Sequence, residues 1–210
     1  NAEASPSEQA AAEELQTCLK DCTGAELPVV TALPAEGTPM IVLGRGPVAV
    51  SLGVSPSSEE LGEQGYVIRT VGPHLVIAGT PAAGTMYGVY DFVEEYLGVR
   101  WYAPGVTHSP KCAGLSLPQV DRLQTPSFAW RYTNYPWSGG DGRFRPHARD
   151  NMGGGGPDHP NGTQYSFDGI AHSFFNYISP GEFFETHPEY FSEIGGVRRK
   201  EDTQLCLSNP

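Results

Sequence analysis

Residues 65–105, GYVIRTVGPHLVIAGTPAAGTMYGVYDFVEEYLGVRWYAPG, decide the fold of this chain. Residues 66–71 and 74–78 are rich in β-branched side chains and alternate in polarity, which is typical of half-buried strands. The Gly72–Pro73 pair interrupts the run between them. Because glycine and proline are strong turn residues, the pattern predicts a β-hairpin.

A helix is expected directly after this hairpin. Thr80 is a candidate N-cap, and Pro81 suits the first helical position, where its missing N–H costs no hydrogen bond. Gly98 suits the left-handed residue that follows a last helical turn. Gly84 and Gly88 each weaken a helix by about 1 kcal/mol relative to alanine, so their spacing predicts close packing on the hairpin. The expected buried face holds Met86, Val89, Tyr90, Val93 and Leu97, and the polar side holds Asp91, Glu94 and Glu95.

The residues before the hairpin predict one further helix and one further strand. Residues 5–19 have a helical apolar pattern, with Ser5 or Ser7 as the cap and Gly24 at the end. Residues 39–44 form a short apolar run that is typical of a strand. With the hairpin and its helix, these elements predict a two-layer α/β unit.

The pattern changes twice along the chain. Residues 46–65 are polar and rich in turn residues, which predicts an irregular surface excursion. Residues 121–126 are interpreted as a linker, with a domain boundary near Leu123, and residues 127–132 begin a new alternating pattern. Residues 133–170 have no periodicity, which leaves a disordered segment or a functional loop as alternatives.

Composition narrows the class of protein. The 210 residues carry a formal net charge of −11, from 13 Lys and Arg against 24 Asp and Glu. This balance argues against nucleic acid as a partner and against a polybasic contact with a membrane. No apolar run approaches the roughly 20 residues that span a bilayer. The 26 glycines and 19 prolines indicate many turns.

The four cysteines leave their state open. Four cysteines allow three pairings, and spacing does not choose among them. Buried or free thiols are favoured, and a disulfide in an exported protein is the alternative. The four residues are Cys18, Cys22, Cys112 and Cys206.

Several motifs carry a resemblance to a known family. They are SEQAAAEELQTCLKDCTGAELP at residues 7–28, GTMYGVYDFVEEYLGVRWYAPG at residues 84–105, HPEYF at residues 187–191 and QLCLSNP at residues 204–210. The chain resembles a family of mostly secreted bacterial proteins of unknown function that have a glycoside-hydrolase-like barrel. That family is distantly similar to α-glucuronidases and β-N-acetylhexosaminidases.

The resemblance implies a fold and a division into domains. Residues 1–122 would form an α/β accessory domain, and residues 123–210 would form the first strands of a (β/α)8 barrel. Residues 127–132 would be the first barrel strand. Since two or three of the eight barrel strands fit, and since the strand that precedes the first helix in the family is missing, we expect a piece of a longer protein.

The resemblance also implies sugar-binding residues. Arg131 matches an arginine that grips sugar hydroxyls at the end of the first barrel strand, and a structural arginine that bridges two domains is the alternative. His172, in GIAHSFFNYISP, would hydrogen-bond a sugar hydroxyl or support such a residue. Asn209 would bind a hydroxyl or cap the following helix.

Three further residues complete the candidate site. Trp137 offers a flat ring for stacking on a sugar, with core packing as the alternative. Arg149 and Asn151 loosely resemble an arginine and asparagine element after the first strand. No catalytic acid is nominated, because the resemblance implies that the acidic pair comes from later barrel strands.

We therefore expect an exported glycoside hydrolase-like protein that acts on polysaccharide or oligosaccharide. The alternatives are a non-catalytic glycan-binding protein on the same scaffold, and an accessory domain that only scaffolds assembly. Carbohydrate is the expected partner, with no nucleic acid and no membrane. No cofactor is expected, and no metal, because His147, His159 and His172 lack the spacing of metal ligands.

Overall fold

The computed structural model describes residues 3–133, 144–152, 160–162, 165 and 173–200. The chain divides into two compact units, Asn1–Tyr165 and Ser166–Pro210. Most of the regular secondary structure that is described belongs to the first unit.

A four-stranded sheet in the order β1-β3-β2-β6 organises the first unit. Strand β1 is parallel to β3, while β2 is antiparallel to both β3 and β6. The predicted hairpin is confirmed, with Val71 opposite His74 across the turn. The strands are β1 (Ile41–Leu43), β2 (Tyr66–Val71), β3 (His74–Gly79) and β6 (Asp121–Gln124).

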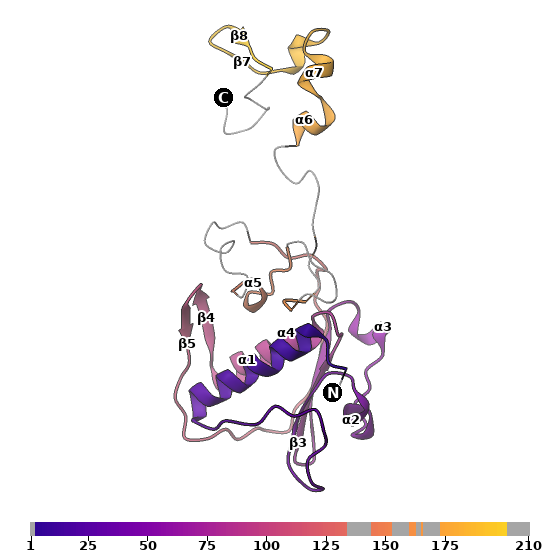
Figure 1. Cartoon of the computed structure of the whole chain (residues 1–210), viewed down its shortest axis with the longest axis vertical. Helices are drawn as coiled ribbons and strands as arrows, with labels where there is room; N and C mark the ends of the chain where they lie inside the picture. The colour runs from indigo at the N-terminus through magenta and orange to yellow at the C-terminus, as the bar shows by residue number, and fades with distance from the viewer. Residues whose placement is uncertain (1–2, 134–143, 153–159, 163–164, 166–172, 201–210) are drawn as a thin grey trace. The chain divides into compact units, whose positions relative to one another are not determined.

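Two helices cover one face of this sheet (Figure 1). They are α1 (Pro6–Thr23) and α4 (Gly84–Phe92), and a π-helix, η1 (Val93–Leu97), continues α4. All five residues of the predicted apolar face are buried, and the left-handed Gly98 ends the π-helix as predicted. The main hydrophobic core of the unit therefore lies between the helices and the sheet.

The predicted cap and end of α1 are also confirmed. The Ser5 hydroxyl accepts from the Glu8 backbone N–H at 3.2 Å, and the Glu8 carboxylate accepts from the Ser5 N–H at 2.9 Å. This reciprocal pair is a capping box. The helix ends at left-handed Gly24.

Helix α4 begins one turn later than predicted. The Thr80 hydroxyl accepts from the Gly84 N–H at 3.1 Å but donates to the Glu63 carbonyl at 2.8 Å. These two bonds hold the intervening residues in a turn, so the first helical residue is Gly84 rather than Pro81. The expected close packing is present: a Cβ on Gly88 would lie 2.7 Å from the Ile77 Cγ2.

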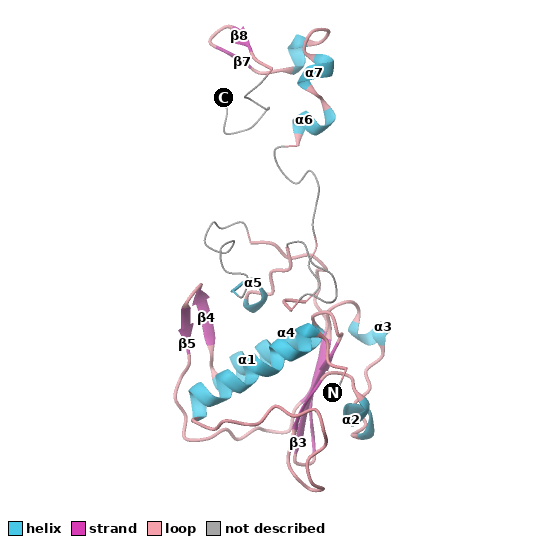
Figure 2. Cartoon of the chain, viewed as in Figure 1, coloured by secondary structure: helices cyan, strands magenta, loops and turns pink. Residues whose placement is uncertain are grey.

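The opposite face of the sheet is covered by α2 (Pro47–Ser51) and α3 (Ser58–Leu61) (Figure 2). The prediction of an irregular surface excursion at residues 46–65 is therefore wrong. Ala49, Val54 and Leu61 are completely buried. Ala49 and Val54 pack on the outward side chains of β2 and β3, because a central strand pair exposes apolar residues on both faces.

The interpretation of residues 121–126 as a linker is also wrong. Strand β6 forms the edge of the sheet, with Arg122 opposite Ile68. Val120, next to it, is buried and exchanges hydrogen bonds with Thr70. The compact unit continues beyond the expected boundary at residues 122 and 123, to Tyr165. It also holds the ribbon of β4 (Arg100–Ala103) and β5 (Val106–His108), and the short helix α5 (Phe144–His147).

The second unit is small and built around one aromatic side chain. Phe191 is buried, and the rings of Phe174, Phe175 and Phe184 surround it at 5.2–6.3 Å. Residues 174–177 form a helix. The elements are α6 (Phe174–Tyr177), α7 (Pro180–Phe183), the 3-10 helix η3 (Pro188–Tyr190), and the hairpin of β7 (Glu193–Ile194) and β8 (Val197–Arg198).

The described residues after β6 hold no barrel. Residues 127–132, expected as its first strand, are not a strand in the structure. An isolated parallel bridge joins Met152 to Tyr165. The structure is thus mixed α/β with small sheets. Across the described residues, no helix is both long and apolar enough to cross a membrane.

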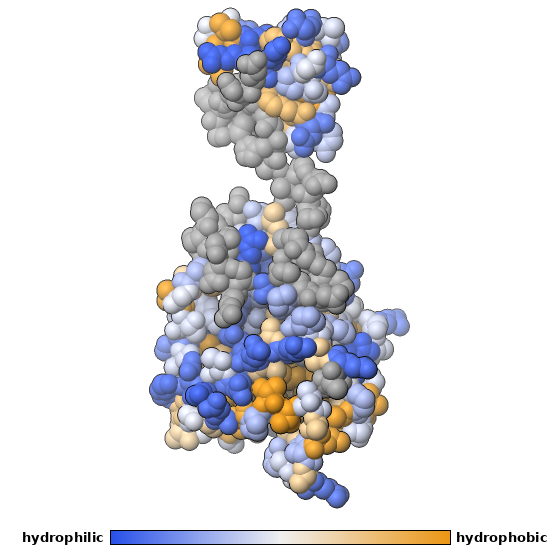
Figure 3. Space-filling model, in the orientation of Figure 1, coloured by the Kyte–Doolittle hydropathy of each residue, from blue (hydrophilic) through white to orange (hydrophobic). Residues whose placement is uncertain are grey.

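Polar and apolar residues share the surface of the first unit (Figure 3). Several exposed apolar side chains come from the segment between α1 and β1, and they are Leu27, Val29, Val30 and Leu33.

Candidate functional site

The structure brings three of the six predicted site residues together, namely Arg131, Arg149 and Asn151. Trp137, His172 and Asn209 lie outside the described residues. The three described residues sit in irregular segments that come after β6 in the chain. We call them, with Gln64 and Asp150, the anchor cluster.

Asn151 is the buried centre of this cluster, with 1% of its surface exposed. Its side-chain Oδ1 accepts from the Arg131 N–H at 2.8 Å, and its Nδ2 donates to the Ala129 carbonyl at 2.7 Å. Its backbone N–H donates to the Arg131 carbonyl and its own carbonyl accepts from the Tyr165 N–H. Asn151 therefore ties two separate segments to itself through both side chain and backbone.

The Asp150 carboxylate likewise accepts hydrogen bonds from backbone N–H groups. One carboxylate oxygen accepts from the Thr133 N–H at 2.9 Å, and the other accepts from the Met152 N–H at 3.0 Å. Its surface is 3% exposed. Because a buried carboxylate needs such donors, these bonds fix the loop around it.

The Arg131 side chain faces protein acceptors with all three of its nitrogens. Nε donates to the Arg149 carbonyl at 2.8 Å, and Nη1 donates to the Phe128 carbonyl at 2.6 Å. Nη2 donates to Gln64 Oε1, at 2.5 Å. The guanidinium also lies 5.4 Å from the centre of the Tyr87 ring, on α4. These contacts fit the structural alternative, in which the arginine bridges segments.

Tyr87 and Tyr90 give the cluster its apolar floor on α4. Burial raises the pKa of both phenols. At Tyr87 the charge of Arg131 opposes that rise, since a cation favours the phenolate. The two phenols therefore act as neutral packing groups beneath the guanidinium groups.

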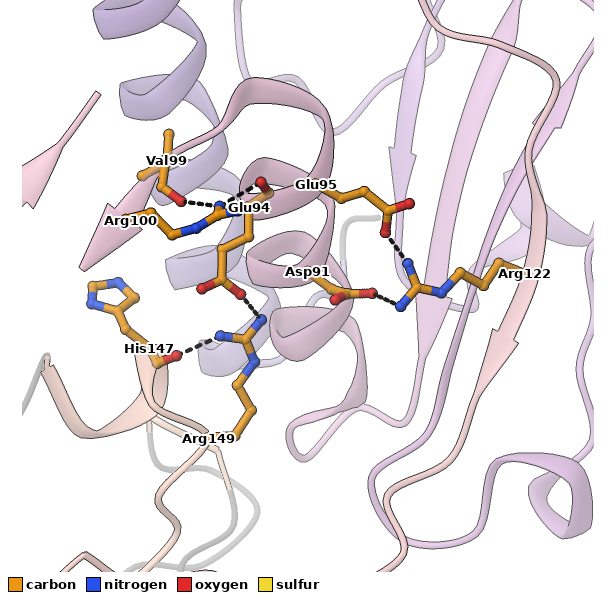
Figure 4. Close-up of polar contacts among 8 residues, drawn as sticks. All are labelled: Asp91, Glu94, Glu95, Val99, Arg100, Arg122, His147 and Arg149. Carbon is orange, nitrogen blue, oxygen red and sulfur yellow. Dashed lines mark hydrogen bonds and ion pairs between the residues drawn. The ribbon is translucent and has the colours of Figure 1, made fainter. Parts of the chain in front are cut away.

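Arg149 makes a second connection to the helical layer (Figure 4). Its guanidinium forms an ion pair with Glu94 of η1 and donates to the His147 carbonyl. It also lies 5.8 Å from the Tyr90 ring centre. Its own backbone is left-handed, with φ of 55°, which is uncommon for a residue other than glycine.

The His147 ring contacts two aromatic rings, those of Tyr90 and Trp101. It stacks on Trp101 with 4.1 Å between centres and 5° between planes. Its Nε2 lies 3.2 Å from Glu14 Oε1, on α1. The contacts of His147 and Arg149 hold the segment of α5 against α1, η1 and β4.

A separate group of ion pairs joins α4 and η1 to the sheet. Arg122 of β6 pairs with Asp91 at 2.8 Å and also with Glu95 (Figure 4). The polar side of the predicted helix is thus occupied by cations from later segments rather than facing only solvent.

Sequence reasoning missed the partners in these contacts. Gln64 is 67 positions from Arg131, and nothing in its local sequence signals the bond. Glu94 was predicted only as a polar helix residue. Among the residues that the structure describes, no group of three or more His, Cys, Asp or Glu side chains is arranged to hold a metal ion.

Comparison with known proteins identifies the family to which the chain belongs. Residues 101–210 match the family described as "Domain of unknown function (DUF4838)", and the match covers more than half of the chain. The chain therefore belongs to that family. Residues 1–92 match the "Glycosyl hydrolase family 67 N-terminus", so the first part is a domain of that accessory type. The resemblance inferred from the motifs is confirmed.

One similar solved structure is titled "A novel family GH115 4-O-Methyl-alpha-glucuronidase, BtGH115A, with specificity for decorated arabinogalactans". It is 22% identical, with a TM-score of 0.49, over 60% of this chain and 17% of that chain. No match was found among curated proteins.

Proposed function

We propose that this chain serves an exported glycoside hydrolase-like protein that acts on polysaccharide or oligosaccharide. The observation that carries the proposal is the tandem of a glycosyl hydrolase family 67 N-terminal domain and a DUF4838 region in one chain. In this proposal the sheet of the accessory domain ends with β6, and a (β/α)8 barrel starts in the residues that follow.

The anchor cluster supports a specific role for the accessory domain. Gln64, which precedes β2, and Glu94, in η1, bind arginines of the segment that comes after β6. Through these bonds the accessory domain holds residues 128–133 and 149–152 in one arrangement. A rigid platform of this kind is what precise positioning of a sugar site needs.

The described contacts bear on three of the six candidate site residues. Arg131, Arg149 and Asn151 act as positioning residues, because their donors bind acceptors within the chain. We propose that direct contact with sugar falls to Trp137, His172 and Asn209. An imidazole and an amide each offer both a donor and an acceptor, which suits hydroxyl groups.

A glycan panel tests the proposal. The protein is incubated with neutral, uronic-acid-bearing and N-acetylated oligosaccharides. Binding is measured by calorimetry, and new reducing ends are measured chemically. We expect both binding and release of sugar for one of the three classes.

The outcomes separate the alternatives. Binding without release supports a non-catalytic glycan-binding protein on the same scaffold. Neither binding nor release, for any member of the panel, overturns the proposal and leaves a scaffold for assembly. Substitution of His172 by Ala then tests direct contact, since loss of binding without loss of stability is expected.

A further inference from the structure

The end of α1 and the segment after β5 meet at two cysteines. The Cys112 N–H donates to the Cys22 carbonyl at 2.9 Å. Cys22 lies in the last turn of α1, where carbonyl groups lack partners within the helix. The Cys112 backbone therefore supplies a bond that the helix end needs.

Neighbouring contacts fix the same segment in place. The Lys111 ammonium donates to the Asp21 carbonyl, on the same last turn of α1. Pro110 lies against the end of η1, where a Cβ on Gly98 would be 3.2 Å from the proline Cγ. Residues 110–112 are thus held between two helix ends, which limits how far Cys112 can move from Cys22.

We infer that Cys22 and Cys112, which are free thiols in the structure, form a disulfide bond under oxidising conditions. A backbone hydrogen bond between two residues holds their Cα atoms within roughly 5 to 7 Å. Disulfides join Cα atoms that are about 4.4–6.8 Å apart. The backbone spacing set by this hydrogen bond thus overlaps the range that a disulfide needs.

The alternative pairing within α1 is not compatible with the helix. Cys18 and Cys22 are four residues apart, so their Cβ atoms are about 5–6 Å apart, whereas a disulfide needs about 3.5–4.5 Å. The Cys18 thiol already donates to Glu14 Oε1 at 3.9 Å. Among the three cysteines that the structure describes, Cys22 and Cys112 are therefore the pair that the backbone brings together.

The two thiols differ in a way that sets the order of reaction. Cys112 is exposed and Cys22 is buried. Burial raises the pKa of the Cys22 thiol, and the neighbouring Cys112 and Asp21 raise it further. Cys112 therefore reacts first, because the thiolate form attacks and access is needed.

The oxidant is a small-molecule or protein disulfide. The Cys112 thiolate attacks one sulfur of that disulfide and releases the first thiol of the oxidant. Cys22 then loses its proton and attacks the Cys112 sulfur of the mixed disulfide, which releases the second thiol. Two protein thiols are oxidised to one disulfide, and one oxidant disulfide is reduced to two thiols.

Peptide mapping of the full chain tests the bond. The purified chain is incubated with oxidised glutathione under native conditions, alkylated, digested without reductant and analysed by mass spectrometry. We expect a cross-linked peptide that contains Cys22 and Cys112, and an increase in the thermal midpoint of roughly 10 °C over the reduced chain.

Matched variants separate the bond from a general effect of oxidation. Cys112→Ser changes an exposed residue, so it is expected to fold and to lose both the cross-link and the thermal shift. Cys18→Ser is expected to keep both. A cross-link from Cys206 to Cys22 or Cys112, or free thiols at both positions after oxidation, would overturn the inference.

Discussion

Arg131 is a candidate site residue whose side-chain contacts come from distant parts of the chain. The motif around it predicted either a sugar contact or a bridge between segments. Its nitrogens donate to Arg149, Phe128 and Gln64, from three places in the chain. A planar fork with fixed donors suits this task, and a lysine cannot reproduce it.

Substitution of Arg131 by Lys is expected to lower the free energy of unfolding by about 2 kcal/mol, since charge-assisted bonds to two part-buried acceptors are lost. Urea unfolding measures the change. Arg69→Lys is the control, because Arg69 pairs with exposed Asp121 and a surface pair contributes about 1 kcal/mol or less.

Sugar affinity gives Arg131→Lys a second readout. At a temperature where the variant stays folded, a positioning role leaves the dissociation constant for the best glycan near that of the natural protein. A tenfold weaker affinity with unchanged stability would instead assign Arg131 to direct contact.

Gly88 tests how closely α4 packs on the hairpin. A Cβ there would lie 2.7 Å from Ile77 Cγ2 and 3.1 Å from the Tyr66 ring, in a closed core. Overpacking costs about 1–3 kcal/mol, which exceeds the roughly 1 kcal/mol that alanine adds to helix propensity.

The Gly88→Ala variant is thus expected to have a free energy of unfolding about 1–2 kcal/mol lower, and therefore a lower urea midpoint. Gly114→Ala is its control, because nothing lies within 4 Å of the added methyl group. Equal midpoints for the two variants would show that the helix can move away from the sheet.

At the scale of elements, the sequence predicted correctly those features that depend only on neighbouring residues. The hairpin turn, the cap at Ser5 and the left-handed Gly98 each depend on neighbours in sequence. The short helices at residues 47–61 were missed because their burial comes from the far face of the sheet. Strand β6 was missed because its polar sequence, DRLQ, is stabilised by pairing with β2 and by Arg122.

Helix α3 carries a pH-sensitive cap. The Ser57 backbone N–H and hydroxyl group bond the Glu60 carboxylate and lower its pKa. Because the folded pKa lies below the unfolded value of about 4.3, the contribution is complete above that pH and is lost as pH falls through the lowered pKa.

Glu60→Gln separates the charge from the bond, since glutamine can keep a capping box. Between pH 5 and roughly pH 3, the natural chain is expected to lose more stability than the variant, measured by urea midpoints. Glu59→Gln, outside the box, should match the natural chain. Identical pH profiles for all three chains would contradict the proposed linkage.

At the scale of the molecule, the fold class and the accessory domain were predictable from motifs, and the organisation after β6 was not. The anchor cluster joins residues that are 18–67 positions apart, so local periodicity could not reveal it. The boundary near residue 123 stays a prediction, although the linker interpretation on which it was based missed the pairing of β6 with β2.

A chain of residues 1–165 is therefore expected to unfold cooperatively, as the first compact unit. A chain ending at residue 118 loses buried Val120, its bonds to Thr70 and the whole of β6. We expect it to be less stable than the chain of residues 1–165 by at least about 3–4 kcal/mol, which is the part due to the burial of Val120 and its two hydrogen bonds. The contacts of α5 and of the anchor cluster are lost as well. Chemical denaturation monitored by circular dichroism measures both, and equal midpoints would place the boundary before β6.

The π-helix at Val93–Leu97 has a consequence for the whole first unit. A wide turn accommodates an extra residue, and each residue of a helix rotates the next one by about 100° around the axis. Excision of one residue from this turn would swing β4 around the helix axis and carry Trp101 away from His147. The geometry of this one backbone turn therefore sets the direction of the β4–β5 ribbon relative to the segment that bears Arg149.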